Sequence, residues 1–267
     1  MTSRNSSWKS DFAAGASGPE TEKTKRTTEF GNRRGPIPLL PAGQDYLWGG
    51  RRLRDDFSKD IPLTPLAETW ECSTHPDGLS LLAEDPDKTL HELLQENPWM
   101  FGTHPAKSMP EAVKKGELPV LIKFIDAASD LSVQVHPDDA YAREHENGQL
   151  GKSEMWYVVD AAPGAKLVYG FSHDMDRERV REAAQNGTLE KHLQRVPIRK
   201  DDVFFIPAGT VHAIGGGSLI AEVQESSNLT YRLYDYHRIG KDGKERPLHL
   251  EKALQVARLS AAEEPRE

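Results

Sequence analysis

Short runs of β-type residues, separated by glycine, proline and aspartate, constrain the fold of this chain more than any other feature. The clearest runs cover residues 119–126, 131–136, 154–160, 165–171, 202–206 and 218–224. Runs of this length between turn residues are typical of strands joined by tight connections. Many such strands with helices inserted at the edges predict an all-β fold with helical insertions, either a sandwich or a barrel of the jelly-roll type.

Three segments have the pattern of helices. Residues from Thr89 to about Asn97 form the first, and Thr89 is the expected N-cap because Glu92 follows three residues later. The second covers residues 176–196, and its apolar residues lie roughly on one face of a helix. An Asn-Gly pair interrupts this segment. The third, residues 247–261, is a predicted terminal helix.

The first 34 residues differ in composition from the rest of the chain. They are rich in Ser, Thr, Lys, Glu, Gly and Arg and lack hydrophobic periodicity, which predicts a disordered leader over residues 1–34. The length of 267 residues suits one large domain, which we expect over residues 35–262, followed by a frayed tail at 263–267.

Bulk composition excludes several classes of protein. The net charge of −8 argues against nucleic acid as the main partner, because phosphate contacts need a basic surface. Hydrophobic residues make up 37% of the chain, and no apolar run approaches the roughly 18 residues that a membrane span requires. The N-terminus lacks an apolar signal region, and the single cysteine, Cys72, excludes an internal disulfide, so we expect a cytoplasmic protein.

Four polar side chains on separate predicted strands form a candidate metal site. The alternation in residues 131–136 puts Gln134 and His136 on one face, opposite three apolar residues. Glu154 begins the next predicted strand, and His212 follows a tight turn that contains proline and glycine. Two imidazoles, a carboxylate and a side-chain carbonyl match a nitrogen and oxygen site for zinc, with iron or manganese as alternatives.

Four other histidines nearby have a different context. They lie in predicted helices or loops, where a plain surface position is the expectation: His145, His173, His192 and His237. A single histidine or glutamate is more often a structural residue than a ligand. The metal prediction therefore rests on the four residues taken together.

Five stretches of the chain carry a more specific signal. They are residues 118–125 (LPVLIKFI), 131–139 (LSVQVHPDD), 151–157 (GKSEMWY), 207–212 (PAGTVH) and 230–235 (TYRLYD). The 207–212 run resembles the second signature motif of the cupin superfamily. Together the five stretches resemble the short bacterial type of class I mannose-6-phosphate isomerase, from about Pro36 to about Leu254. The segments around Trp48 and from Glu68 to Ser73 also resemble the N-terminal part of that family.

This resemblance implies a fold, an activity and a cofactor. The fold is a cupin-type jelly-roll β-barrel. The activity is the interconversion of mannose 6-phosphate and fructose 6-phosphate by proton transfer through an enediol. The cofactor is one Zn²⁺ per subunit, and its ligands carry over to Gln134, His136, Glu154 and His212.

The resemblance also implies roles for other residues. Arg232 matches the family's catalytic arginine, and Lys152 matches a lysine near the substrate. Four more positions match polar positions of the pocket: Lys123 and Ser132, associated with the phosphate, and Glu222 and Arg238. Because arginine stays protonated, Arg232 can stabilise the enediolate or bind the phosphate but cannot be the base. The base is left open between Lys152 and Glu222.

The length of the chain leaves other functions open. Members of this family usually continue into a further small β-domain, whereas this sequence ends soon after Leu254. We therefore expect exposed apolar surface, which dimerisation would cover, and both a monomer and a homodimer are considered. One alternative function is a non-catalytic cupin-like module that binds a sugar phosphate. Another is a cupin-type metal oxygenase, which the Gln-His-Glu-His set fits less well.

Overall fold

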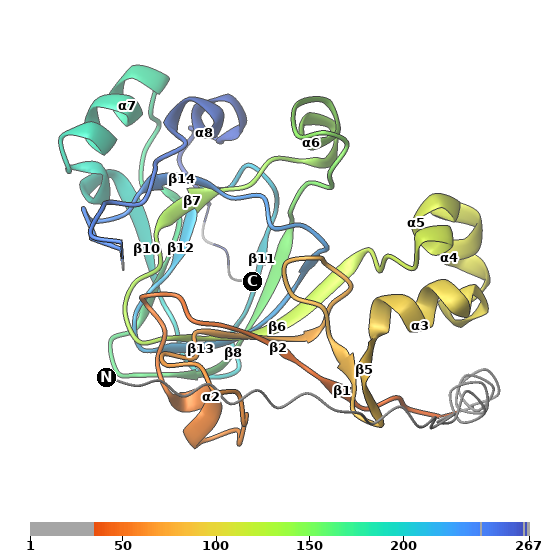
Figure 1. Cartoon of the computed structure of the whole chain (residues 1–267). Helices are drawn as coiled ribbons and strands as arrows, with labels where there is room; N and C mark the ends of the chain where they lie inside the picture. The colour runs from red at the N-terminus through yellow and green to blue at the C-terminus, as the bar shows by residue number, and fades with distance from the viewer. Residues whose placement is uncertain (1–34, 241, 264, 266–267) are drawn as a thin grey trace, which may run out of the picture. The chain divides into compact units, whose positions relative to one another are not determined.

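The computed structural model describes residues 35–240, 242–263 and 265 (Figure 1). The predicted leader at 1–34 and most of the predicted tail lie outside these residues, so the predicted domain boundaries stay predictions. Residues from Ile37 onward belong to one compact unit. None of the described helices has the length and apolar character that crossing a bilayer requires.

Two antiparallel sheets form the framework of this unit. The six-stranded sheet has the order β11-β8-β13-β6-β3-β2, with strands at Val203–Ile206, Glu154–Ala161, Ser218–Glu225, Val120–Ala127, Glu68–Cys72 and Ala42–Gln44. The five-stranded sheet has the order β10-β9-β12-β7-β14, with strands at Leu193–Pro197, Lys166–Phe171, His212–Ile214, Val133–Val135 and Tyr231–Tyr234. A small sheet contains β1 (Leu39–Leu40), β4 (Leu81–Leu82) and β5 (Asp85–Thr89).

Helices lie at the edges of this framework. Figure 1 shows α3, α4 and α5 grouped on one side of the sheets, away from α7 and α8. The described helices are α2 (Arg52–Asp55), α3 (Leu90–Glu96), α4 (Thr103–Ser108), α5 (Pro110–Lys115), α6 (Asp139–His145), α7 (Arg177–Gln185) and α8 (Leu250–Val256), with 3₁₀ turns η1 (Pro98–Phe101) and η2 (Leu189–His192).

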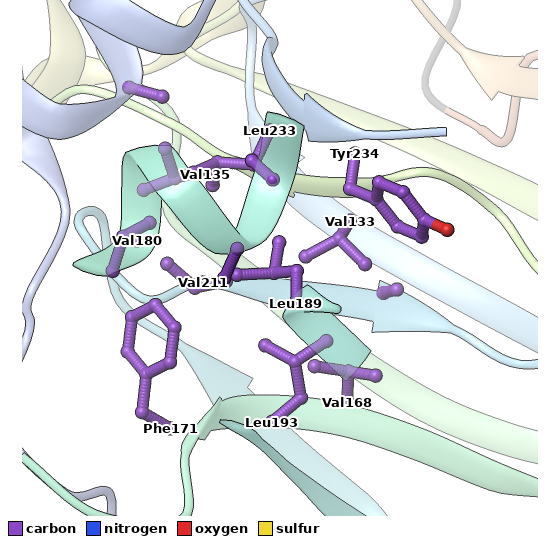
Figure 2. Close-up of a cluster of buried hydrophobic side chains, with 14 of the residues drawn as sticks. Val133, Val135, Val168, Phe171, Val180, Leu189, Leu193, Val211, Leu233 and Tyr234 are labelled. Carbon is purple, nitrogen blue, oxygen red and sulfur yellow. The ribbon is translucent and has the colours of Figure 1, made fainter. Parts of the chain in front are cut away.

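Two apolar cores hold these layers together. The first combines Trp156 and Phe204 of the six-stranded sheet with Leu167 of the five-stranded sheet, so it lies between the two sheets. The second covers the other face of the five-stranded sheet, where Val133 and Val135 of β7 pack with residues of α7 and α8 (Figure 2). The apolar face of β7 is therefore buried under helices, which leaves its polar face pointing between the sheets.

The prediction of a mostly β fold with helical insertions is confirmed. All six predicted runs are strands, displaced by no more than a few residues at their ends. The predicted cap of α3 is also present, because Thr89 Oγ1 accepts from the Glu92 amide at 3.0 Å and the Glu92 carboxylate accepts from the Thr89 amide at 2.8 Å. A closed barrel of the cupin type stays a prediction.

Two predicted helices were too long. Within 176–196, α7 ends at Gln185, and Leu193–Pro197 is strand β10, paired antiparallel with β9. Gly187 has a φ of 73°, a left-handed conformation that ends the helix and lets the chain turn back to the sheet. Within 247–261, α8 ends at Val256, and the following residues run beside β9, where the Ala262 amide donates to Phe171 O at 2.8 Å.

The outer face of the six-stranded sheet carries exposed apolar side chains. Phe205 and Val203 of β11 are 62% and 56% exposed, and Tyr157 of β8 is 37% exposed. The apolar surface expected from the length of the chain stays a prediction. Its coverage by a second copy stays a prediction.

Candidate active site

The four predicted ligands come from both large sheets. Gln134 lies in β7 and His136 directly after it, while His212 begins β12 and Glu154 begins β8. Gln134 is paired across strands with His212 on one side and with Arg232 on the other. The structure therefore brings these side chains to one place because the polar face of β7 meets the first residue of β8 across the space between the sheets.

The ligand atoms converge closely. Nitrogen atoms of His136 and His212 and an oxygen of Glu154 all lie within 4.8 Å of one another, and the three residues are buried. Glu154 Oε1 is 3.2 Å from His136 Nε2, and Glu154 Oε2 is 3.7 Å from His212 Nε2. Gln134 Nε2 lies 3.4 Å from His212 Nε2. Because amide nitrogen and oxygen are assigned rather than observed, a flip of this amide would present its oxygen to the same point.

Backbone carbonyls orient both imidazoles. His136 Nδ1 lies 2.7 Å from Leu229 O, and His212 Nδ1 lies 2.8 Å from Thr210 O. A carbonyl only accepts, so each Nδ1 carries the proton and each Nε2 presents a lone pair to the centre of the site. The turn before His212 contributes as well, since Gly209, with a φ of 84°, donates its amide to His136 O at 2.9 Å.

The protonation states suit a metal ion. Burial, together with the charge of Lys152, lowers the pKa of His136 to about 3, so the imidazole is neutral. Burial would raise the pKa of Glu154, but Lys152 and His136 outweigh it and hold that pKa well below its usual range. Although Lys152 Nζ lies 2.6 Å from Oε1, both Glu154 oxygens lack a hydrogen-bond partner of good geometry. A buried, ionised carboxylate beside two neutral imidazoles supplies the oxygen and nitrogen donors that fit a divalent cation.

A cavity of about 270 Å³ opens beside these ligands. Six of the predicted site residues line it: Lys123, Ser132, Gln134, Lys152, Glu222 and Arg232. Its apolar walls include Trp156 and Ile214. A polar cavity of this size, bordered by a candidate metal site, is suited to a small charged substrate.

A buried charge cluster lies on the side of the cavity formed by the six-stranded sheet. Lys123 Nζ is 3.4 Å from Glu68 Oε2 and 3.3 Å from Glu222 Oε1. Burial opposes the charge of Lys123, but the two carboxylates outweigh it and raise the pKa of this lysine. Burial and the nearby Glu154 raise the pKa of Glu222. The lysine therefore stays charged, whereas the Glu222 carboxyl is shifted toward accepting a proton.

Arg232 lies on the opposite sheet. Its Nε donates to Ser132 Oγ at 3.3 Å, and its Nη1 donates to Pro247 O at 2.9 Å. Burial and the neighbouring Arg246 lower the pKa of Arg232, which nevertheless remains a cation because free arginine titrates above about 12. The guanidinium is thus fixed at the cavity wall with a permanent charge.

Comparison with known proteins identifies the family of this chain. Residues 37–160 match the family of type I phosphomannose isomerase catalytic domains. The mannose-6-phosphate isomerase of Streptococcus mutans is 42% identical over 223 residues, which cover 83% of this chain and 67% of that protein. The chain belongs to the type I phosphomannose isomerases. The family predicted from the sequence motifs is confirmed, and the chain is an enzyme of this family.

Further relatives of the family agree. The mannose-6-phosphate isomerase ManA of Bacillus subtilis is 38% identical over 231 residues, which cover 86% of this chain and 70% of that protein. A crystal structure of the Bacillus subtilis mannose 6-phosphate isomerase superposes with a TM-score of 0.76 at 38% identity, covering 85% of this chain and 69% of that one. The similarity to this crystal structure supports the mostly β fold with several helices described above.

The structure adds residues that the sequence motifs left without a role. The cavity is also lined by Tyr46, Trp48, Glu68, Asn228, Thr230 and Arg246. Trp48 and Glu68 belong to segments that resemble the phosphomannose isomerases, and this resemblance was the feature of the sequence that could have placed them in the cavity. Nothing in the sequence around Arg246, a run of charged residues before a proline, distinguishes it from a solvated loop.

Arg238 does not line the cavity. Its guanidinium lies 5.2 Å from the centre of the Tyr236 ring and its Nε donates to Asp235 at 3.1 Å. The pocket position implied for Arg238 therefore differs from what the structure shows. Of the remaining histidines, His145, His173 and His237 are exposed and His192 is half-buried, and within the described part of the chain none of them joins the candidate metal cluster.

Proposed function

We propose that this protein interconverts mannose 6-phosphate and fructose 6-phosphate, with Zn²⁺ held by Gln134, His136, Glu154 and His212. One observation carries the proposal: a buried His-Glu-His cluster borders a cavity lined by lysine, arginine and glutamate side chains. Relatives that carry the name mannose-6-phosphate isomerase support the same reaction.

The reaction moves one proton between C1 and C2 of the open-chain sugar through an enediol. A bound zinc ion would supply Lewis acidity toward the sugar oxygens without a change of redox state. The protein must supply a base that reaches both carbons and a cation that compensates the negative charge that develops on the oxygens. Arg232 meets the second requirement because its charge is permanent and its side chain is fixed by Ser132 and Pro247.

Two side chains could serve as the base. Lys152 lines the cavity with its Nζ 3.4 Å from His136 Nε2. Glu222 lines the same cavity, and its Oε2 accepts from Trp156 Nε1 at 2.8 Å while its Oε1 lacks a hydrogen bond. We assign the catalytic role to Lys152 and Arg232, and substrate binding to Lys123, Ser132 and Glu222. The proposed chemistry requires the sugar to lie between the two sheets.

A coupled assay of fructose 6-phosphate formation tests this function. Zinc-loaded protein should convert mannose 6-phosphate, and His136→Ala should lose both bound zinc and turnover. His145→Ala, at an exposed histidine outside the cluster, is the matched control and should retain both. Absence of turnover in fully zinc-loaded protein that still binds the phosphosugar would favour the non-catalytic binding module instead.

A further inference from the structure

The chain segment after β14 returns to the cavity. Strand β14 ends at Tyr234, and an antiparallel bridge between Ile239 and Glu245 folds the following residues back on themselves. The return is fixed next to Arg232, whose Nη1 donates to Pro247 O and whose carbonyl accepts from the His249 amide at 2.8 Å. Arg246, the residue before Pro247, consequently lines the cavity together with Arg232.

A buried carboxylate holds the Arg246 guanidinium in place. Asp235 is 4% exposed and accepts from Arg246 Nε at 2.7 Å and from Arg246 Nη2 at 2.6 Å. This two-point contact fixes the plane of the guanidinium. Within the described residues, Nη1 of Arg246 makes no hydrogen bond, so one side of the group is available to a ligand.

The cavity wall has an excess of positive charge at this position. Asp235 is shared between Arg246 and Arg238, and Arg238 also donates to the backbone of Asp130. Arg232 donates to neutral acceptors, the hydroxyl of Ser132 and the carbonyl of Pro247. Two guanidinium groups therefore share the Asp235 carboxylate, and a third, that of Arg232, has only neutral acceptors. Arg232 and Arg246 line the cavity.

We propose that Arg246 binds the phosphate group of the substrate, with Asp235 as the positioning residue that orients it. The proposal rests on the function given above, because it takes the substrate to be a phosphosugar. A phosphate dianion matches the excess of charge, and a planar guanidinium with a fixed orientation can donate to two of its oxygens. Arg246 thereby sets specificity for phosphorylated over free sugars.

Binding of glucitol 6-phosphate, which lacks the carbonyl group and cannot isomerise, tests the proposal by calorimetry. In Arg246→Gln the dissociation constant of zinc-loaded protein should rise about 10- to 100-fold, because a charge-assisted hydrogen bond is lost. KM for mannose 6-phosphate should rise by a similar factor with little change in kcat.

Three further variants separate a phosphate contact from a structural effect. Arg246→Lys should restore part of the affinity because it keeps the charge. Asp235→Asn should weaken binding less than Arg246→Gln, since the arginine remains but is less well oriented. Arg238→Gln removes an arginine that contacts the same Asp235 outside the cavity lining, and its affinity for glucitol 6-phosphate should stay close to wild type.

The outcomes distinguish the two proposals. Unchanged affinity and KM in Arg246→Gln, with normal turnover in the wild type, would overturn the role of Arg246 and leave the isomerase intact. Binding of glucitol 6-phosphate by wild-type protein that turns over no mannose 6-phosphate would overturn the isomerase, while loss of that binding in Arg246→Gln would still support the phosphate contact. If Arg246→Gln lost affinity for glucitol and for glucitol 6-phosphate by the same factor, the role of Arg246 in binding the phosphate would also be overturned.

Discussion

Lys152 and Glu222 lie on the same side of the cavity but in different electrostatic surroundings. Lys152 contacts the carboxylate of Glu154 at 2.6 Å, whereas Glu222 lies between the Trp156 indole and Lys123. A base that must serve two neighbouring carbons needs a position close to the sugar oxygens and hence to the metal ligands. We infer that this proximity favours Lys152 as the base, which requires the ammonium group that pairs with Glu154 to lose its proton before it acts. Glu222 is then left to bind the sugar beside Lys123.

The assignment of the base can be tested by substitution. Lys152→Met should lower kcat by about 10²–10⁴-fold, the usual contribution of general acid–base catalysis. Glu222→Gln should raise KM more than it lowers kcat. Zinc content, measured on both variants, controls for damage to the metal site. The opposite pattern, with kcat lost mainly in Glu222→Gln, would assign the base to Glu222.

Asp235 should give the stability of the protein a defined pH dependence. Burial raises the pKa of this carboxyl, but Arg246 and Arg238 outweigh burial and the net shift is downward. A carboxyl with a lower pKa in the folded than in the unfolded state stabilises the protein above its unfolded pKa of about 3.9, and this contribution is lost as pH falls through the folded value. Asp235→Asn should therefore melt below wild type at neutral pH, and the difference should shrink below about pH 4. A difference in melting temperature that stays constant from pH 7 to pH 3 would contradict this account.

At the scale of secondary structure, helix α3 depends on its cap. Thr89 and Glu92 satisfy amide groups at its N-terminus reciprocally, and Leu90, Leu93 and Leu94 are buried. Thr89→Ala should lower the free energy of unfolding by about 0.5–2 kcal/mol, measured by urea denaturation. Ser108→Ala in the exposed helix α4 is a suitable control and should have a smaller effect, because Ser108 does not cap an N-terminus. Equal effects of the two substitutions would mean that the cap is not the source of stability.

Strands β7 and β10 show which secondary structure a single sequence can predict. The alternation along β7 was decisive, because a period of two puts Gln134 and His136 on one face whatever the surrounding fold. Residues 193–196 were misassigned to a helix because Leu189, Leu193 and Val196 also satisfy a helical spacing. Pairing of β10 with β9 and burial of Leu193 and Val196 decide in favour of a strand, and these contacts come from distant parts of the chain.

The composition of the cavity shows the limit of such prediction. The cavity residues on the long strands could be predicted from the sequence. The family motif that contains them and the strand face on which they lie both indicate the cavity. Arg246 could not, because its position depends on a return of the chain that is fixed by Asp235 and Arg232. Loop residues are positioned in a site by tertiary contacts, and a local sequence pattern does not predict these contacts.

At the scale of the whole molecule, the candidate metal site connects the two large sheets. Gln134 and His212 belong to the five-stranded sheet and Glu154 to the six-stranded sheet, so a bound ion would link both. The Glu154 carboxylate is buried and lies between the two imidazoles and Lys152. An ion that binds the folded but not the unfolded chain stabilises the fold by mass action.

Removal of the metal should therefore lower global stability as well as activity. Zinc at about 100 times its dissociation constant should add about 2.7 kcal/mol to the free energy of unfolding, and chelation should reverse this gain. The melting temperature of wild-type protein should rise with added zinc, whereas that of His136→Ala should not respond. His145→Ala should respond as wild type does, because His145 is exposed and outside the cluster. A zinc-dependent rise that persists in His136→Ala would place the stabilising ion elsewhere and separate the metal from the cavity.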